Sequence, residues 1–400
     1  MARIGIYGGS FNPPHIGHIR AAEQLISILQ LDRLLVIPAG IPPHKKLADG
    51  TPPEEERLLL CQAAFSAVEK AEVSDIEILR SGISYTVDTV KELHERYPDD
   101  SLFLVMGTDM LLSFSSWYHP EEIVQYATLA VMHRYENDAA LNSAVCAAIN
   151  QIRTQFAAEV LTVENEPIAT SSTEVRRMIA FGCPEGLVSR ETAEMIRTNA
   201  YYMYGRDKTH MPLDELINYS LSLHDAKRVP HVLGCCETAQ LLAKQYGADQ
   251  ADAARAGILH DVTKALSYTA QLLLCEHYHI ALSDAERCNS KLLHAKTGAA
   301  VAKYVFGEND AVCSAIYWHT TGKADMSLLE KIIYIADYME PNRDFDGVEV
   351  LRALVREDLD AALLEGFRMS LELLKRKGKV IDPNSLQAWE YLSAERRQIT

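Results

Sequence analysis

The chain has 400 residues, of which 48% are hydrophobic and 24% are charged, and its formal net charge at pH 7 is −16. The length favours two domains over a single compact core, and the negative charge argues against a broad nucleic-acid or anionic-membrane surface. We find no apolar run near the roughly 18 residues needed to span a membrane, no signal peptide and no disulfide-like spacing among the eight cysteines, which together predict a cytoplasmic protein.

Strand-like and helical segments alternate along the first half of the chain. The expected strands are short apolar runs bounded by turns: "ARIGIYGG", "RLLVIPAG", "AEVSDIEIL", "SLFLVMG", "ATLAVMHR" and "AEVLTVEN". The expected helices between and after them are "GHIRAAEQLISILQL", "TPPEEERLLLCQAAFSAVEKA", "TVDTVKELHERYP" and "SSTEVRRMIAFG". Such alternation predicts βαβ units and a mainly parallel sheet.

The pattern changes near Tyr204, where the polar stretch "YGRDKTHMP" is typical of a linker. After it almost no strand-like alternation remains, so the second half is expected to be all-α. We predict a first domain over 1–204, a linker over 205–212 and a second domain over 213–400. The helical patterns of the second half are Leu213–Leu223, Pro230–Tyr246, Gln250–His260, Leu292–Phe306, Asp310–Trp318, Leu328–Met339, Val348–Arg356 and Leu359–Arg376.

The first strand runs into the segment "GGSFNPPHIGH", from Gly8 to His18. A glycine-rich turn after a strand lets the backbone approach phosphate oxygens, and the helix that follows offers free N–H groups and a positive dipole end. Two histidines three residues apart can face one target across the first helical turn. The alternative is a proline-rich turn with incidental histidines. The candidate residues of this segment are Gly8, Gly9, Ser10, Phe11, His15 and His18.

A second phosphate-binding pattern opens the last helix of this half, at "TSSTEVR". Ser172 and Thr173 at a helix start, with Arg176 one turn later, combine hydroxyls, backbone amides and a guanidinium. Simple helix capping is the alternative, since Ser171 and Glu174 have capping-box spacing. The presence of both patterns in one domain favours a nucleotide site.

The "HIGH" sequence resembles the HxGH signature of the nucleotidyltransferase superfamily, which implies a Rossmann-like fold. The segments "PPHKK", "SYTVDTV" and "MGTDML", together with Trp117, make 1–204 similar to bacterial nicotinate-mononucleotide adenylyltransferases. Other HxGH adenylyltransferases usually lack the PPHK and SYTxDT segments, which ranks the phosphopantetheine and nicotinamide-nucleotide enzymes lower.

This resemblance implies attack by the phosphate of nicotinate mononucleotide on the α-phosphorus of ATP, giving deamido-NAD and pyrophosphate. Such a transfer needs positioning and charge neutralisation more than covalent chemistry, with Mg²⁺ bridging the ATP phosphates. For Trp117 and Asp109 a purely structural role is the alternative. The implied roles are phosphate contacts for His15, His18 and Lys45, β- and γ-phosphate binding for Ser172, Thr173 and Arg176, pyridine binding for Tyr85, Thr86 and Trp117, and nucleotide contacts for Gly107, Asp109 and Arg134.

In the second half, histidines and aspartates recur at intervals along the predicted helices. Asp337 stands in an otherwise apolar helix, where a carboxylate must be paired or ligate a metal. Histidine and aspartate suit divalent iron, manganese or zinc, and helices that converge can assemble such a site. The alternative is that each histidine is an ordinary core or surface residue. The six candidates are His231, His260, Asp261, His294, His319 and Asp337.

The order H…HD…H…H…D resembles the HD-domain metallophosphohydrolases of the six-ligand type. The segments "LHDVTK", "LLHAKTGA", "YWHTTGK", "SLLEKIIYIADYMEPNRDFDGV" and "KGKVIDPNSLQAWEYL" make this half similar to the bacterial HD family of symmetrical diadenosine-tetraphosphate hydrolases. Lys323 departs from this family, which often has arginine there.

The resemblance implies two divalent metal ions, iron or manganese. The first would be held by His231, His260, Asp261 and Asp337, and the second by His294 and His319 with Asp261 as a bridge. Diadenosine tetraphosphate would be hydrolysed to two ADP. Lys264, Thr321 and Arg343 are candidate phosphate contacts, and a surface role is the alternative for Lys264.

The sequence therefore predicts a bifunctional enzyme whose partners are small-molecule nucleotides, with no nucleic-acid or membrane partner and with a homodimer left open. Two alternatives stand beside this interpretation. One is a different HxGH adenylyltransferase fused to an HD phosphodiesterase for cyclic or guanosine nucleotides. The other is a nucleotide-sensing regulator in which one site binds without turnover.

Overall fold

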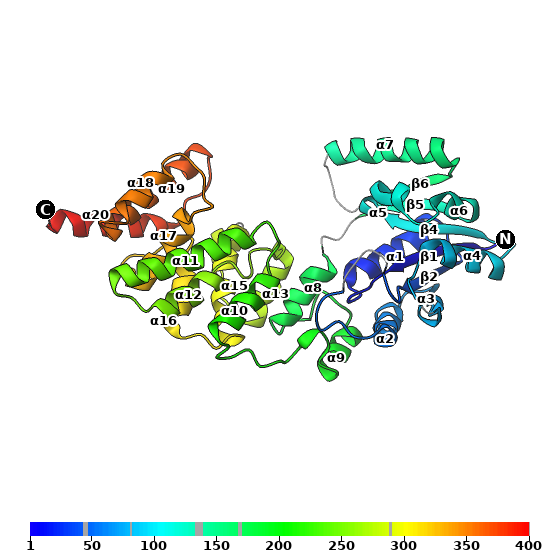
Figure 1. The fold of residues 1–400 in the computed structure, drawn as a ribbon, viewed down its shortest axis with the longest axis horizontal. Helices are drawn as coiled ribbons and strands as arrows, with labels where there is room; N and C mark the ends of the chain where they lie inside the picture. Colours follow the sequence, from blue (N-terminus) through cyan, green and yellow to red (C-terminus); the bar gives the residue numbers. More distant parts are fainter. Residues whose placement is uncertain (43–46, 81, 133–138, 167–169, 288–289, 400) are drawn as a thin grey trace. The chain divides into compact units, whose positions relative to one another are not determined.

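The structure is a computed structural model that describes residues 1–42, 47–80, 82–132, 139–166, 170–287 and 290–399. The chain divides into two compact units, Met1–Arg206 and Asp207–Thr400 (Figure 1), and each is described by itself. Within the described ranges no helix is both long enough and apolar enough to cross a membrane.

A six-stranded sheet forms the centre of the first unit, in the order β3-β2-β1-β4-β5-β6, and every neighbouring pair of strands is parallel. The order reverses between β1 and β4, and ligands of open α/β sheets bind beyond the carboxyl ends of the strands at such a switch point. The "GGSFNPPHIGH" segment leaves the sheet at this position. The strands are β1 (Arg3–Gly9), β2 (Arg33–Pro38), β3 (Ala71–Val73), β4 (Ser101–Gly107), β5 (Thr128–Met132) and β6 (Val160–Val163).

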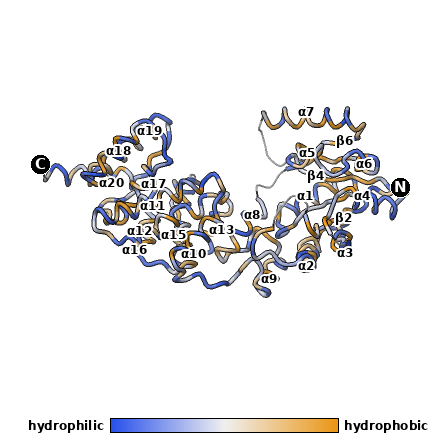
Figure 2. Tube along the Cα trace, viewed as in Figure 1, coloured by the Kyte–Doolittle hydropathy of each residue, from blue (hydrophilic) through white to orange (hydrophobic). Residues whose placement is uncertain are grey.

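Each face of the sheet carries its own hydrophobic core, because successive strand residues point to opposite sides. On β4, Leu102 and Leu104 belong to one core and Phe103 and Val105 to the other. The hydrophobic stretches follow the strands in Figure 2. The first core is covered by α3 (Ile76–Leu79), α4 (Thr86–Arg96), α5 (Thr108–Ser113), α6 (Pro120–Tyr126) and α7 (Ala139–Phe156), and the second by α1 (Ile16–Ile28) and α2 (Glu54–Phe65).

After β6 the first unit ends in helices that begin at serine caps. Ser171 accepts a hydrogen bond from the backbone N of Glu174, at 3.2 Å, and so starts α8 (Ser172–Ala180). Ser189 does the same for α9 (Arg190–Thr198). A cap of this kind satisfies one of the amides that a helix start leaves without a partner. The remaining short helices of the unit are η1 (Phe114–Ser116) and η2 (Tyr201–Met203).

The second unit contains helices and, among its described residues, no strand. Its helix starts are again set by side-chain caps, for example the reciprocal pair of Ser327 and Glu330. The helices are α10 (Leu213–Ser222), α11 (Val229–Tyr246), α12 (Gln250–Leu259), α13 (Tyr268–His277), α14 (Asp284–Arg287), α15 (Ser290–Tyr304), α16 (Asp310–Trp318), α17 (Leu328–Met339), α18 (Val348–Leu354), α19 (Leu359–Arg376) and α20 (Pro383–Ile399).

The predicted fold class, an α/β domain followed by an all-α domain, is confirmed. The single strand expected over "AEVSDIEIL" is wrong beyond Val73, which is the last residue of β3. Asp75 is the N-cap residue of α3, and the backbone N–H of Ile78 donates to the carbonyl of Asp75 at 2.8 Å. The apolar residues after Asp75 therefore belong to α3 rather than to the sheet.

Candidate active sites

The turn after β1 is supported by buried side chains. Phe11, 1% exposed and at φ 40°, packs edge-on against Phe65 and His18. The guanidinium of Arg57, which is fully buried, donates to the carbonyl oxygen of Ser10 at 3.1 Å and to that of Gly40 at 2.8 Å. The predicted phosphate-binding turn is thus held in one conformation by groups beneath it.

His15 and His18 lie against each other at the start of α1, with ring centroids 3.7 Å apart. The backbone N–H of His15 donates to Nδ1 of His18 at 3.2 Å, so Nε2 carries the proton of a neutral His18 ring. Gly17 lies between them, and a Cβ there would lie 3.0 Å from both Nδ1 of His15 and Cγ2 of Thr170, so these side chains would have to move by a few tenths of an ångström. The glycine of "HIGH" thus leaves room for the packing of the two tilted rings, and His18 can act as a hydrogen-bond donor through Nε2.

The second predicted phosphate-binding segment contacts the first. Ser172 Oγ donates to the carbonyl of Pro13 at 3.0 Å, and Arg176 donates to the carbonyl of Asn12 at 2.6 Å and to Oγ1 of Thr173 at 3.1 Å. The start of α8 therefore lies beside the turn after β1, although about 160 residues separate them in the chain. Both patterns that were singled out for phosphate binding meet at one place.

The other candidates of the first unit lie at the ends of neighbouring elements. Gly107 ends β4 and Asp109 is in the first turn of α5. Tyr85 precedes α4, which begins at Thr86, and its ring lies 4.5 Å from that of Tyr118, a residue that the sequence did not single out. The indole of Trp117 donates to Ser113 Oγ at 3.3 Å and packs on Phe114. Lys45 and Arg134 lie outside the described residues.

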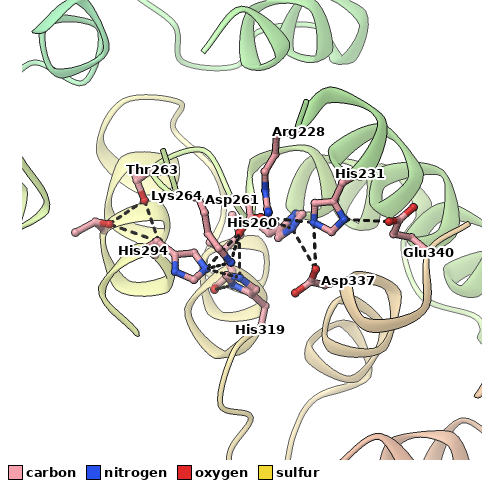
Figure 3. A network of polar contacts seen from close by, with 12 residues as sticks. Arg228, His231, His260, Asp261, Thr263, Lys264, His294, His319, Asp337 and Glu340 are labelled. Carbon is pink, nitrogen blue, oxygen red and sulfur yellow. Dashed lines mark hydrogen bonds and ion pairs between the residues drawn. The ribbon is translucent and has the colours of Figure 1, made fainter. Parts of the chain in front are cut away.

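In the second unit all six predicted metal-ligand candidates come together (Figure 3). Five helices supply them: α11 carries His231, α15 carries His294 and α17 carries Asp337, while His260 and Asp261 follow α12 and His319 follows α16. His260 and Asp261 are fully buried, and His294 and His319 are each 2% exposed. The cluster is a buried polar centre inside a helical core.

The two carboxylate oxygens of Asp261 face different halves of this cluster. Oδ2 lies 3.5 Å from Nε2 of His231 and 3.5 Å from Nε2 of His260, and Asp337 Oδ1 lies 3.2 and 3.7 Å from the same two nitrogens. Oδ1 of Asp261 lies 3.2 Å from Nε2 of His294 and 3.6 Å from Nε2 of His319. Asp261 therefore occupies the position of a bridge between two groups of donors.

Two of the histidines, His260 and His319, present an unprotonated Nε2 atom to the centre. Nδ1 of His260 faces the carbonyl of Gly257 at 2.7 Å, and Nδ1 of His319 faces that of Ile316 at 2.6 Å. Because a carbonyl can only accept, both Nδ1 atoms carry the proton and each Nε2 offers a lone pair. Nε2 of His231, Nε2 of His260 and Oδ1 of Asp261 are buried and make no hydrogen bond among the described residues. This donor set fits divalent transition metals.

Three cationic side chains border the cluster. Arg228 pairs with Oδ2 of Asp261, Lys264 Nζ lies 3.3 Å from Oδ1 of the same residue, and Arg343 pairs with Asp337 at 2.5 Å. Burial, with help from the Lys264 charge, lowers the pKa of His294 to about 4, so this ring is neutral at pH 7. Thr321 is placed differently, since its hydroxyl donates to the carbonyl of Gly322 at 3.0 Å.

The two units resemble different families of known proteins. Residues 6–178 match the model of the cytidylyltransferase-like family. A probable nicotinate-nucleotide adenylyltransferase of Carboxydothermus hydrogenoformans is 35% identical over 50% of this chain and 98% of its own length. The chain belongs to the nicotinate-nucleotide adenylyltransferase family. Another member, from Shewanella sp. strain MR-7, is 32% identical over 50% of this chain and 99% of its own length.

Beyond the adenylyltransferase half, residues 228–342 match the model of the HD domain. This range contains all six histidines and aspartates of the buried cluster. A solved structure from Clostridium acetobutylicum, a predicted HD superfamily hydrolase involved in NAD metabolism, is 40% identical over 46% of this chain and 98% of that one, with a TM-score of 0.45.

Arg57 is a residue of the adenylyltransferase half that sequence reasoning missed. A signal existed, because Arg57, Leu60, Cys61 and Ala64 share one helix face and the last three are apolar. An arginine on a buried face must find acceptors, and here it finds the carbonyls of Ser10 and Gly40. Arg57 thus ties the turn after β1 to the loop after β2.

Replacing Arg57 by methionine is expected to lower the free energy of unfolding of the first unit by about 3 kcal/mol, since the buried carbonyl of Gly40 and the partly buried carbonyl of Ser10 lose charge-assisted hydrogen bonds. Denaturant unfolding of the full chain measures this. Arg20→Met is the matched control, because the Arg20 side chain is 62% exposed and pairs with Glu23, a contact worth about 0–1 kcal/mol. Equal midpoints for the two variants would contradict the prediction.

Glu340 is a second residue that sequence reasoning missed, three positions after Asp337. It is 1% exposed, faces Nδ1 of His231 at 3.1 Å and accepts two hydrogen bonds from Asn342. Gly234 makes room for it, since a Cβ there would lie 2.2 Å from Glu340 Oε2. A carboxylate behind a histidine orients the ring and makes its other nitrogen a better ligand.

Glu340→Gln is therefore expected to weaken binding of Mn²⁺ to the metal-free protein by about 10- to 100-fold, which calorimetric titration measures. Glu372→Gln serves as the control, because Glu372 is 63% exposed and pairs with Arg368 on its own helix, α19. Unchanged Mn²⁺ affinity in Glu340→Gln would show that this carboxylate does not support His231.

Proposed function

We propose that the chain is a bifunctional enzyme. The first unit would transfer the adenylyl group of ATP to nicotinate mononucleotide, releasing pyrophosphate and giving deamido-NAD. The second would hydrolyse diadenosine tetraphosphate symmetrically to two ADP. The first assignment is supported by the hydrogen bonds between the "GGSFNPPHIGH" segment and the start of α8, and by the membership of the chain in the adenylyltransferase family. The buried cluster of four histidines and two aspartates carries the second.

In the first unit the residues act by positioning and by neutralising charge. In a neutral His18 ring the proton is on Nε2, and it would be donated to an oxygen of the α-phosphate, where charge develops as the bond to pyrophosphate breaks. His15 supports that ring from below. The amides at the start of α8, with Ser172, Thr173 and Arg176, would bind the β- and γ-phosphates of Mg²⁺-ATP.

The acceptor nucleotide would bind on the other side of β4. Backbone donors of the Tyr85–Thr86 segment would bind the nicotinate carboxylate, because the first turn of α4 has no side-chain cap and presents a positive dipole end. The N–H of Tyr85 itself donates to the carbonyl of Ile83 at 3.1 Å, so the donors would come from the residues that follow it. Trp117 would stack on the pyridine ring. Nicotinate is preferred over nicotinamide in this proposal because the relatives named above are nicotinate-nucleotide enzymes.

In the second unit, His231, His260, Asp261 and Asp337 would hold one divalent ion, iron or manganese, and His294 and His319 a second, with Asp261 shared. When bound, the two ions would supply Lewis-acid activation of water and of the phosphoryl oxygens. Lys264 and Arg343 carry charge to the edge of the cluster, where they would neutralise the phosphate chain. Arg228 was not selected from the sequence, but it also pairs with Asp261 at the edge of the cluster and would contribute a third positive charge.

Product analysis of the purified full chain tests both assignments. One reaction contains ATP, Mg²⁺ and either nicotinate or nicotinamide mononucleotide, and the other contains diadenosine tetraphosphate with Fe²⁺ or Mn²⁺. We expect deamido-NAD in the first and ADP as the sole product in the second. No dinucleotide with either mononucleotide would overturn the first assignment, and cleavage to AMP and ATP would overturn symmetrical hydrolysis. Binding of both nucleotides without turnover would favour the sensing regulator.

A further inference from the structure

A buried polar network borders the start of α4, the segment to which binding of the nicotinate carboxylate is assigned. Tyr85, the residue before this helix, provides no side-chain cap, so other contacts must fix the position of the first turn. Thr89, one turn into the helix, is 2% exposed, and its hydroxyl donates to Oε1 of Glu77 at 2.7 Å. Because Glu77 belongs to α3, this hydrogen bond fastens the start of α4 to a neighbouring element.

Glu77 is the centre of this network. The residue is 8% exposed, and besides the bond from Thr89 it takes a hydrogen bond from the Ser84 side chain. Arg80 completes the group, since its Nη2 donates to Oγ1 of Thr89 at 2.5 Å. Burial raises the pKa of Glu77, and the contacts with Thr89, Arg80 and Ser84 offset part of that rise. A buried carboxyl group is costly unless such partners satisfy it, so Glu77 joins Thr89 and Ser84 at one place.

Ser84, which directly precedes Tyr85, ties the network to the loop after β2. It is 6% exposed, and its Oγ accepts a hydrogen bond from the backbone N–H of Gly40 at 3.1 Å. Its own N–H donates to the carbonyl of Ile41 at 3.0 Å. A Cβ at Gly40 would lie 2.9 Å from the carbonyl oxygen of Glu77, so a glycine at this position lets the loop and α3 approach closely.

The same loop is bonded through a carbonyl group to the turn after β1. Arg57 donates to the carbonyl of Gly40 at 2.8 Å and to that of Ser10 at 3.1 Å. Hydrogen bonds thus lead residue by residue from the turn after β1 to the first turn of α4. The series is Ser10, Arg57, Gly40, Ser84, Glu77 and Thr89. The two segments assigned to the two substrates are therefore parts of one buried framework.

We propose that Glu77, acting with Ser84 and Thr89, is a positioning residue of adenylyl transfer. It would hold the Tyr85–Thr86 segment so that the phosphate of bound nicotinate mononucleotide faces the α-phosphorus of ATP, because transfer between two substrates depends on their relative placement. Glu77 would act through this segment rather than by contact with a substrate. The inference rests on the proposed transferase function and adds to it the residues that place the acceptor.

Steady-state kinetics of the full chain with Mg²⁺-ATP and nicotinate mononucleotide tests the proposal. Thr89→Val keeps the shape of the side chain and removes its hydroxyl, and Glu77→Met removes the carboxyl group. Both variants are expected to raise the KM for nicotinate mononucleotide by about 10-fold, because a buried partner loses its hydrogen bond. The KM for ATP should change less than about twofold, since Arg57 still holds the turn after β1.

Matched variants separate positioning from a general effect on the fold. Glu77→Gln keeps an oxygen that can accept from Thr89, so its KM for nicotinate mononucleotide should stay close to that of the wild type. Thr154→Val is the control for Thr89→Val, because Thr154 is exposed and its hydroxyl donates to the carbonyl of Asn150 on its own helix, α7. Thr89→Val carries the test by itself if Glu77→Met does not fold.

An unchanged KM for nicotinate mononucleotide in Thr89→Val would overturn the positioning role and leave the transferase proposal standing. Equal rises in the two KM values would do the same, since they would show a general effect on the first unit. A wild-type chain that forms no dinucleotide would overturn the transferase proposal itself, and the positioning role with it.

Discussion

Replacing Asp261 by alanine is expected to lower hydrolysis of diadenosine tetraphosphate by more than about 100-fold, because supporting residues around a metal already cost 10- to 100-fold when lost. Asp261 is fully buried, and its two oxygens face both groups of histidines. Removing it takes a ligand from both proposed ions and leaves Arg228 and Lys264 without their partner. The measurement is the rate of ADP release at saturating Mn²⁺.

Two comparisons make the Asp261 result specific. Deamido-NAD formation by the same protein should stay at the wild-type rate, since the proposed adenylyl-transfer site belongs to the other unit. Asp346→Ala is a matched aspartate control, because Asp346 is exposed and lies outside the cluster. Loss of both activities in Asp261→Ala would contradict two independent sites.

Replacing His18 by alanine is expected to lower adenylyl transfer by about 10²- to 10³-fold, the usual cost of removing one donor aimed at charge that develops in a transition state. Nδ1 of His18 is already used by the backbone of His15, so the donor that is lost is the Nε2 proton. The turnover rate with saturating ATP and nicotinate mononucleotide measures the loss, which should appear in kcat more than in KM.

His94→Ala is the control for His18, because His94 lies on the last turn of α4 against Tyr126 and away from the turn after β1. Hydrolysis of diadenosine tetraphosphate should be the same in both variants. If His18→Ala kept more than a tenth of the wild-type turnover, the role assigned to His18 would be wrong.

The layered fold of the first unit could be predicted because its strands are short apolar runs separated by amphipathic helices. The strand prediction failed where such a run changes structure partway. After Val73 the two polar residues Ser74 and Asp75 interrupt the alternation, and Asp75 is the N-cap residue of α3, a local signal that the single-strand interpretation passed over. Helix α7 was not predicted, although it buries Val145, Ile149 and Ile152. Its many alanines and polar residues give it only a moderate apolar stripe.

The candidate site residues that lie in short sequence motifs could be predicted from the sequence. Histidine and aspartate spacing indicated the cluster, but Glu340 and Arg228 act through contacts that only the folded chain creates. Arg57 is similar, since its acceptors are backbone carbonyls, which no sequence pattern displays. The pairing of Tyr85 with Tyr118 also depends on how α4 meets the segment after η1.

The cations around the buried cluster would compete with metal ions for the same two carboxylates. Arg228 and Lys264 contact Asp261, and Arg343 contacts Asp337. If Asp261 and Asp337 held divalent ions, these three positive side chains would lose their carboxylate partners and could bind phosphate groups instead. Metal would then have to bind before a polyphosphate, because the cations could contact the substrate only after the metal had displaced them.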